Sequence, residues 1–507
     1  MSTSSSENSN LNIFKRISFF NDINKFWFFL ISLYFFTRLT TWFYPIDGDH
    51  WIFWTVGKNI AEGGSLYITS WDHKAPLVFF FNAFLYIVGG DNIWIHRFII
   101  TLVSILGVYL FYKLAIILTN SEQNKAIDLK VKVALIFYVF WINLSHISSG
   151  GNNNENLGII FLIGSYLSYL TFFKNKNFRF LILAGFLVSC LFFLKVNFSL
   201  FALPILIHIL FTEWKNLKKI ITYFVIFGIP VLAHIIFWVI YFYSRNSLDD
   251  FLIAAFFFNS KYISSGWIGK VSGQLGFIAI NIPLITTFLI SLYLATKQFK
   301  AQRNEPLYIF LLSCGFTSLL FISLLGTFYP YYYLIIIPCV SLLCGIFLGS
   351  IDYNQIVNKL LLIIIIGCSL IAGGISLKQP YNFFAGEAKV DFEEQTEVAN
   401  YIKDNSSRED KVIAYVYGST FYYLTSREQG IRYTSASNIL LNYRENYGFN
   451  LNEKFIEDAE KNRPKYVIMI KDENNLYSVN KPLIQYFNEK YVLDKSFDNY
   501  VVMKRVN

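Results

Sequence analysis

The sequence predicts an integral membrane α-helical bundle of about eleven spans, followed by a C-terminal extracytoplasmic α/β domain. Hydrophobic residues make up 54% of the chain and its mean hydropathy is +0.43, which is typical of membrane proteins. Many apolar runs are long enough to cross about 30 Å of hydrocarbon as helices. After residue 378 these long runs stop, and strand and helix patterns alternate instead. The chain therefore divides into a membrane domain, residues 26–378, and a second domain, residues 379–507.

The apolar runs define the expected spans and the charges define their direction. We predict spans at residues 26–44, 92–118, 131–149, 157–173, 179–196, 198–213, 220–243, 273–296, 307–327, 331–349 and 358–377. The joints between these runs alternate between rich and poor in Lys and Arg. Because Lys and Arg gather on the cytoplasmic side, the rich joints are placed inside. The N-terminal tail, residues 1–25, is then cytoplasmic, and the chain is a multi-pass protein of the plasma membrane.

One apolar run, residues 75–89, is short for a span. If it crossed the membrane, every later Lys-rich joint would lie on the outer side, against the charge rule. We therefore predict that it forms a helix lying along the outer membrane surface. The segment from Trp51 to Gly64 mixes aromatic and charged residues and predicts a second surface helix, which the two glycines at its end would stop.

The uneven charge argues against nucleic-acid binding. From residue 378 onward the chain has 18 Lys and Arg against 19 Asp and Glu, whereas the remainder has 25 against 15. The basic excess thus belongs to the membrane domain, where the orientation rule accounts for it. All five cysteines lie within apolar runs, which argues against a disulfide framework and against a structural zinc site.

The second domain shows the pattern of a small α/β fold. Residues 390–402 form an amphipathic pattern typical of a helix. Residues 411–417 and 464–470 are short β-rich runs, and residues 491–503 resemble a closing hairpin. Alternation of strands and helices predicts one sheet with helices packed on it.

The first outer loop, residues 45–91, concentrates charge beside very apolar segments. It holds two close carboxylates and a polar cluster: Asp47, Asp49, Asp72, His73 and Lys74. Charge at a membrane surface is costly unless it serves a pathway or a site. We therefore look for chemistry in this loop. On the residues alone, Asp47 and Asp49 could equally cap the following helix, since Asp is a favoured N-cap.

The order of motifs in this part of the chain resembles the GT-C membrane glycosyltransferases, in particular bacterial relatives of protein O-mannosyltransferase and of the aminoarabinose transferase that acts on lipid A. The motifs are DGDH (47–50), EGGSLY (62–67), WDHKAP (71–76), Arg97 before a long span, NNNEN (152–156) and YPYYYLIIIP (329–338). The sequence departs from the family where a histidine usually precedes a tyrosine, because Pro330 and Tyr331 stand there.

The resemblance implies transfer of a sugar from a polyprenyl-phosphate donor to the hydroxyl of a lipid, glycan or protein acceptor, with membrane lipids around the site. Asp49 is the candidate general base, with Asp47 behind it. Lys74 and Arg97 are the candidates for stabilising the lipid phosphate, although Lys74 could also be a lysine that merely reaches toward water, and Arg97 could instead pair with an acidic residue.

Further polar residues are candidates for binding the substrate. Asp72 and His73 make Lys74 part of a polar cluster, and the others are Glu155, Lys195, Arg38 and Tyr332. A buried partner such as Glu155 or Asp47 would explain Arg38, which lies inside the first span. No cofactor is assigned. A divalent metal stays open because His50 and His73 lie near carboxylates, which is a weak signal.

Two other classes of function stay open on the sequence alone. A polytopic transporter or flippase of lipids or polysaccharides would also carry charges near its spans, but paired repeats with Gly/Pro breaks are not visible here. A non-catalytic membrane protein could use its outer domain to bind glycans or peptides. An enzyme is distinguished from both if Asp49, Lys74 and Arg97 converge on one cavity open to lipid and water.

Overall fold

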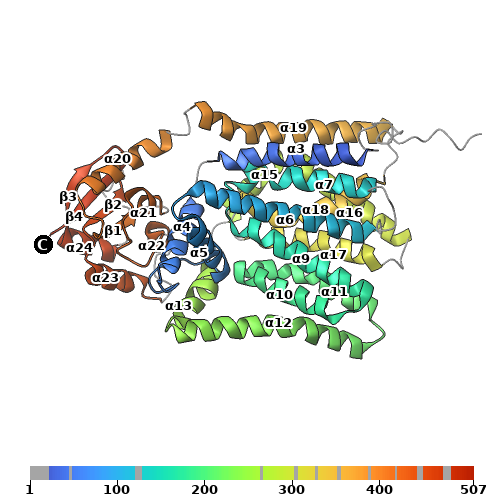
Figure 1. The fold of residues 1–507 in the computed structure, drawn as a ribbon, viewed down its shortest axis with the longest axis horizontal. Helices are drawn as coiled ribbons and strands as arrows, with labels where there is room; N and C mark the ends of the chain where they lie inside the picture. Colours follow the sequence, from blue (N-terminus) through green and yellow to red (C-terminus); the bar gives the residue numbers. More distant parts are fainter. Residues whose placement is uncertain are drawn as a thin grey trace, which may run out of the picture.

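The computed structural model describes residues 22–44, 48–119, 128–262, 267–301, 306–325, 329–350, 356–385, 390–416, 419–441, 449–471 and 481–506. They form a bundle of long helices with a smaller, sheet-containing domain at one end (Figure 1). The predicted helical bundle with a C-terminal α/β domain is confirmed as a fold. Residues 1–21, which include most of the predicted N-terminal tail, and Asp47 lie outside the described residues.

Long helices make up most of the bundle. They are α3 (Ile23–Trp42), α6 (Ile93–Thr119), α7 (Leu129–Ile142), α9 (Asn154–Asn175), α10 (Phe178–Leu194), α11 (Leu203–Thr212), α12 (Leu217–Ser244), α15 (Trp267–Ile280), α16 (Ile282–Ala301), α17 (Pro306–Leu324), α18 (Ile337–Leu348) and α19 (Ile356–Ala385). Shorter elements join them: α4 (Gly48–Ala61), α5 (Pro76–Gly89), α8 (Ser145–Ser148), η2 (Val196–Ala202), α13 (Leu248–Leu252), η3 (Ile253–Phe258), α14 (Asn259–Tyr262) and η4 (Pro330–Ile336).

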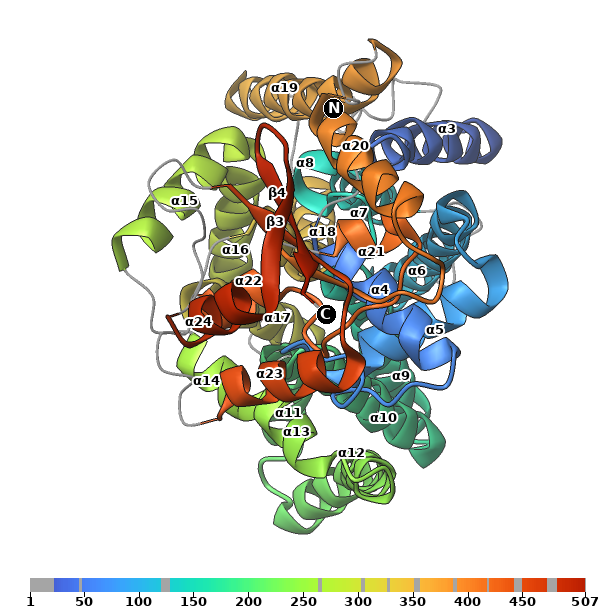
Figure 2. The same ribbon diagram turned by 90° about the vertical axis from the view of Figure 1, so that its left-hand side faces the viewer.

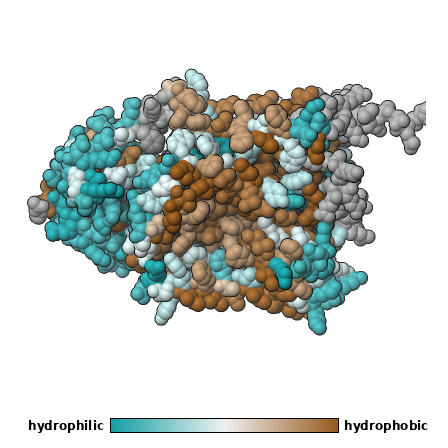
Figure 3. All heavy atoms as spheres, viewed as in Figure 1, coloured by the Kyte–Doolittle hydropathy of each residue, from teal (hydrophilic) through white to brown (hydrophobic). Residues whose placement is uncertain are grey.

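Five helical segments in the described part of the chain are long and apolar enough to cross a membrane, or six if one bent pair counts as a span. The five are α6, α9, α12, α17 and η4 with α18. The helices at 76–89, 178–194 and 196–212 are apolar but shorter. Eleven spans therefore stay a prediction. The surface is apolar over the bundle and hydrophilic over the end domain (Figure 3), as expected for a bundle that faces lipid.

Some predicted spans are not continuous helices. The span expected at 273–296 consists of α15 and α16, whose segments Gln274–Ile280 and Leu284–Lys297 meet at 88°. Pro283 has no backbone N–H to continue the first helix but suits the start of a new one, which explains the break there. Similarly, the expected span at 198–213 begins as a 3₁₀ segment, η2, before α11.

The end domain has a four-stranded sheet in the order β1-β2-β4-β3. The strands are β1 (Val412–Tyr415), β2 (Tyr466–Ile470), β3 (Tyr491–Ser496) and β4 (Tyr500–Arg505), with helices α20 (Val390–Asp404), α21 (Thr420–Thr425), α22 (Ala436–Leu441), α23 (Leu451–Asn462) and α24 (Lys481–Lys490). β1 and β2 are parallel, and β3 and β4 form the predicted hairpin. The domain boundary expected at residue 378 falls inside α19, which continues to Ala385.

The two short helices of the first outer loop lie between the bundle and the end domain (Figures 1 and 2). α4 and α5 are the helices that the sequence predicts, and they pack against each other. α4 ends before Gly63, whose φ of +95° suits glycine and stops the helix as expected. A 14-residue helix rises only about 21 Å, so α5 is too short to cross the hydrocarbon core.

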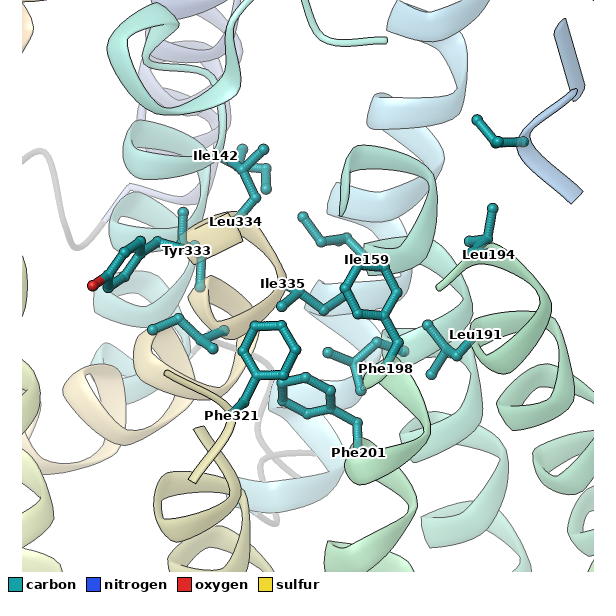
Figure 4. Close-up of a cluster of buried hydrophobic side chains, with 14 of the residues drawn as sticks. Ile142, Ile159, Leu191, Leu194, Phe198, Phe201, Phe321, Tyr333, Leu334 and Ile335 are labelled. Carbon is teal, nitrogen blue, oxygen red and sulfur yellow. The ribbon is translucent and has the colours of Figure 1, made fainter. Parts of the chain in front are cut away.

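Below the α4–α5 end, the helices pack through a layer of buried hydrophobic side chains (Figure 4). They come from α7, α9, α10, η2, α17 and η4, and include Ile159, Leu194, Phe198, Phe321 and Ile335. Gly158 allows α9 to approach η2 and η4 closely, because an added Cβ would lie 3.1 Å from the side chains of Phe198 and Ile335. This packed layer gives a rigid base for the polar groups above it.

The predicted orientation can be tested by reporter fusions. If α5 lies along the outer surface, a reporter inserted at residue 120 is expected on the cytoplasmic side, and one at residue 65 on the outer side, because one crossing, α6, separates them. Alkaline phosphatase and fluorescent-protein fusions measure the two sides independently. A residue-120 fusion on the outer side would mean that α5 crosses the membrane.

Candidate functional site

A cavity of about 390 Å³ lies where the first outer loop meets the starts of α9, η2, η4 and the α13–α14 segment. Four charged side chains and two tyrosines line it: Asp49, Lys74, Glu155, Lys195, Tyr331 and Tyr332. Apolar side chains complete the wall, among them Phe53, Leu194, Phe256 and Leu324. A mostly apolar cavity with a few convergent polar groups is the usual form of a ligand site.

Lys74 links two carboxylates at this cavity. Its Nζ lies 3.2 Å from Asp49 Oδ1 and 3.1 Å from Asp72 Oδ1. Asp72 is 1% exposed, whereas Asp49 is 27% exposed and is the carboxylate that lines the cavity. Asp49 lies in the first turn of α4, and its contacts are with side chains across the cavity. The carboxylate of Asp49 therefore does not cap α4, although the sequence alone left that alternative open.

Tyr331 holds the other oxygen of the same carboxylate. Its hydroxyl donates a hydrogen bond of 2.9 Å to Asp49 Oδ2, from η4 and 282 residues away in the chain. The sequence resemblance leads one to expect a histidine before a tyrosine at this place. Tyr331 departs from that pattern, but its hydroxyl still provides a hydrogen-bond donor. Asp49 is thus fixed by a cation on one oxygen and a phenol on the other.

These contacts set the charge of the pair. Burial alone would raise the pKa of Asp49, but Lys74 and the Tyr331 hydroxyl outweigh it and lower that pKa below its usual value. Burial likewise opposes the charge of Lys74, yet Asp49 and Asp72 together raise its pKa above the usual lysine value. At neutral pH Asp49 is therefore an ionised acceptor and Lys74 an ammonium.

The loop that carries Lys74 is fixed through its backbone. The Tyr67 hydroxyl donates to the carbonyl of Lys74 at 2.8 Å, and the amide of Asn259 donates to the carbonyl of His73 at 2.7 Å. Burial lowers the pKa of His73 to about 4, against the opposing effect of Asp72, so this imidazole is neutral at pH 7. The net charge of the loop therefore comes from Asp72 and Lys74.

A second ion pair faces the cavity. Lys195 Nζ lies 2.8 Å from Glu155 Oε1, and the same ammonium lies 3.4 Å from the centre of the Tyr332 ring. Glu155 is in the first turn of α9, and Lys195 follows the last residue of α10. The structure thus brings together Glu155, Lys195 and Tyr332, three residues that the sequence suggested one by one.

The two predicted arginines lie elsewhere. Arg97 donates to the carbonyls of Trp42 and Tyr44, the latter at 2.6 Å, and does not line the cavity. Arg38 donates to the Thr101 hydroxyl at 3.1 Å. The expected convergence therefore holds for Asp49 and Lys74 but not for Arg97. Likewise, the expected partner of Arg38, Glu155, is paired with Lys195 instead.

Some cavity residues were not predicted. Tyr331 was noted only as a departure, while Asn154 and Asn259 were not singled out. The polar run at 152–156 marked the place of Asn154, and its neighbour Glu155 was predicted. For Asn259 the sequence gives no signal, because its contact with His73 spans 186 residues.

The described residues contain no group of three or more His, Cys, Asp or Glu side chains arranged to hold a metal ion. Asp49 and Asp72 are both carboxylates, but Lys74 lies within 3.2 Å of each and already provides the positive charge. His73 adds a neutral imidazole beside Asp72. The described donor set therefore does not fit a divalent metal, and no step is assigned to one.

The end domain contacts the loop that carries the site. The backbone N–H of Trp71 donates to the Arg432 carbonyl at 2.6 Å, and the Thr434 N–H donates to the Trp71 carbonyl at 3.3 Å. On the other side, Lys454 pairs with Asp250 of α13 at 2.7 Å. The domain therefore supports both the Asp72–Lys74 loop and the segment that leads to Asn259.

Comparisons with known proteins show which families and folds this chain resembles. Residues 73–240 match the family model described as dolichyl-phosphate-mannose-protein mannosyltransferase. A search of curated proteins found no match.

Solved structures share the fold over most of the chain. ArnT from Cupriavidus metallidurans bound to undecaprenyl phosphate aligns with a TM-score of 0.62 and 11% identity, over 96% of this chain and 99% of that one. The oligosaccharyltransferase of Archaeoglobus fulgidus tethered to an acceptor peptide gives 0.53 and 11%, over 95% and 74%. AglB from the same organism, with an inhibitory peptide and a dolichol-phosphate, gives 0.51 and 11%, over 93% and 74%. The chain therefore has the fold of these membrane glycosyltransferases, and residues 73–240 match a mannosyltransferase family model.

Proposed function

We propose that this protein transfers a sugar from a polyprenyl-phosphate donor to an acceptor hydroxyl at the outer face of the membrane, with inversion at the anomeric carbon. One observation carries the proposal: a single cavity holds an ionised carboxylate, Asp49, and two ammonium groups, Lys74 and Lys195. The related structures with undecaprenyl phosphate or dolichol-phosphate support a phosphorylated polyprenol as the ligand.

In the proposed step, the acceptor oxygen forms a bond to the anomeric carbon while the bond from that carbon to the phosphate oxygen breaks. The phosphate takes the electron pair, and the hydroxyl proton passes to Asp49. A carboxylate with a lowered pKa is a modest base, but it is fully ionised and the hydroxyl becomes acidic as its oxygen bonds to carbon. At neutral pH Asp49 is therefore in the form that accepts a proton, and this matters more than its modest proton affinity.

The two ammonium groups stabilise the charge that gathers on the leaving phosphate. Lys74 Nζ lies 3.2 Å from Asp49 Oδ1, so a phosphate oxygen that accepts a hydrogen bond of about 3 Å from the same ammonium would lie at most about 6 Å from the base. The ammonium thus keeps the leaving phosphate close to the base, and the reacting atoms would lie beside it. Lys195 provides a second cation in the same cavity, in the role that the sequence suggested for Arg97.

The function can be tested in cells with and without the gene. Lipid extracts are compared by mass spectrometry, and surface glycans by composition analysis. We expect cells without the gene to accumulate one polyprenyl-phosphate sugar and to lose that sugar from one class of acceptor. Equal lipid pools, with no glycan lost, would contradict the proposal.

Tyr331→Phe is expected to move the acidic limb of the pH profile of kcat/KM to higher pH. The hydroxyl helps to lower the pKa of Asp49, so its loss raises that pKa and protonates the base at a higher pH. A hydrogen bond to a charged group contributes about 1.5–3 kcal/mol, which corresponds to about one to two pH units. Tyr332→Phe is the matched control, since it keeps a ring beneath Lys195. An unmoved limb in Tyr331→Phe would contradict the assignment of Asp49.

A further inference from the structure

Two asparagines of the cavity wall carry a buried amide oxygen that accepts no hydrogen bond. These atoms are Oδ1 of Asn154 and Oδ1 of Asn197, and both residues line the cavity. Asn154 is 6% exposed at the start of α9, and Asn197 lies in η2. A buried polar atom without a partner costs about 1–3 kcal/mol of folding free energy, so its presence in a cavity suggests that a ligand satisfies it.

The two asparagines flank the second ion pair. Asn154 precedes Glu155, and Asn197 follows Lys195 by two residues. The ion pair of 2.8 Å and both asparagines line the same cavity. This wall offers several neutral hydrogen-bonding groups, in contrast to the charged Asp49–Lys74 pair.

The chemistry of the wall matches the hydroxyl groups of a sugar ring. A hydroxyl both donates and accepts a hydrogen bond, and an amide has an acceptor and two donors to offer it. A phosphate has only acceptors, so it is served better by the ammonium groups. We infer that Asn154 and Asn197 form a hydroxyl-binding subsite for a sugar ring, which deepens the proposed function and rests on it.

The test separates the sugar from its lipid carrier. The dissociation constants of bare undecaprenyl phosphate and of undecaprenyl-phosphate mannose, glucose and galactose are measured on the purified full-length protein. At least one sugar lipid is expected to bind the wild type more tightly than the bare lipid. Asn154→Leu and Asn197→Leu are each expected to reduce this gain about five-fold, the value of one hydrogen bond, and to leave the bare lipid unaffected.

Thermal stability distinguishes a binding role from a structural one. Leucine removes the unsatisfied oxygen, so Tm of both variants is expected to stay equal or to rise while the sugar gain falls. Asn156→Leu is the matched control on the same helix. Asn156 donates to Asn153 Oδ1 at 3.0 Å and does not line this cavity, so its loss should lower Tm and keep the sugar gain.

A second arm identifies the source of the ring. Methyl glycosides of the same three sugars are titrated into protein saturated with undecaprenyl phosphate. If Asn154→Leu and Asn197→Leu weaken only this binding, the ring belongs to the acceptor; if they weaken only the sugar lipids, it belongs to the donor. The inference is overturned if neither arm responds to the variants, if both variants lower Tm, or if the wild type gains nothing from any sugar. The lipid comparison in cells tests the proposed function independently of these results.

Discussion

Asp49→Asn is expected to lower sugar transfer about 10²–10⁴-fold, the usual contribution of a positioned general base, while the protein still folds and binds the lipid donor. Asparagine keeps the size of the side chain and an oxygen that Tyr331 can still contact. Lys74 keeps its 3.1 Å contact with Asp72. Purified variant and wild type should therefore show similar Tm and similar donor affinity but very different kcat.

Asp47→Asn provides the control for this result. If Asp47 only supports the start of α4, its replacement is expected to cost about 1 kcal/mol of local stability and to leave most of the activity. The opposite order, with Asp47→Asn inactive and Asp49→Asn near normal, would move the base by two residues. Normal activity of both variants at normal protein levels would refute the mechanism.

Lys74→Ala is expected to reduce both donor affinity and turnover. A charge-assisted hydrogen bond contributes about 1.5–3 kcal/mol, so the donor should bind about 10- to 100-fold more weakly. Turnover falls as well, because the same ammonium meets the phosphate as it leaves. The variant also removes the shared counter-ion of Asp49 and Asp72, so the pKa of Asp49 should rise.

Lys74→Arg shows whether the effect of Lys74→Ala comes from the lost charge or from a damaged fold. It keeps a cation in the cavity and is expected to retain more donor affinity than Lys74→Ala, as measured by binding of undecaprenyl phosphate. Lys195→Ala should weaken binding and move the acidic limb of the pH profile less than Lys74→Ala does, since Lys195 pairs with Glu155 and is only a secondary charge for Asp49. Equal donor affinity in wild type and Lys74→Ala would exclude Lys74 from the phosphate site.

The local pattern of the sequence predicted much of the fold. Helices α4 and α5 follow from amphipathic and apolar runs that end in glycines, and the strands of the end domain follow from short β-rich runs between polar segments. The interruption between α15 and α16 was missed, because hydropathy averages over a window and does not register one proline. Local composition also did not show that η2 is a 3₁₀ segment.

The site was predicted where its members are close in the chain. Asp72, His73 and Lys74 are adjacent, so their cluster is visible in the sequence. The partners of Asp49 and His73 from distant segments, Tyr331 and Asn259, depend on how the helices pack, which no local pattern encodes. Arg97 was assigned to the cavity because it carries charge beside the outer loop, yet its guanidinium serves backbone carbonyls.

The backbone contact between Trp71 and the segment around Tyr433 has a consequence for how the enzyme matures. A ribosome makes the chain from its N-terminus, so residues 71–74 enter the membrane environment long before residues 432–434 exist. Until then the N–H and carbonyl of Trp71 lack the partners that hold them in the finished protein. The loop bearing Lys74 thus acquires this backbone support only when a segment 363 residues further along the chain has been made.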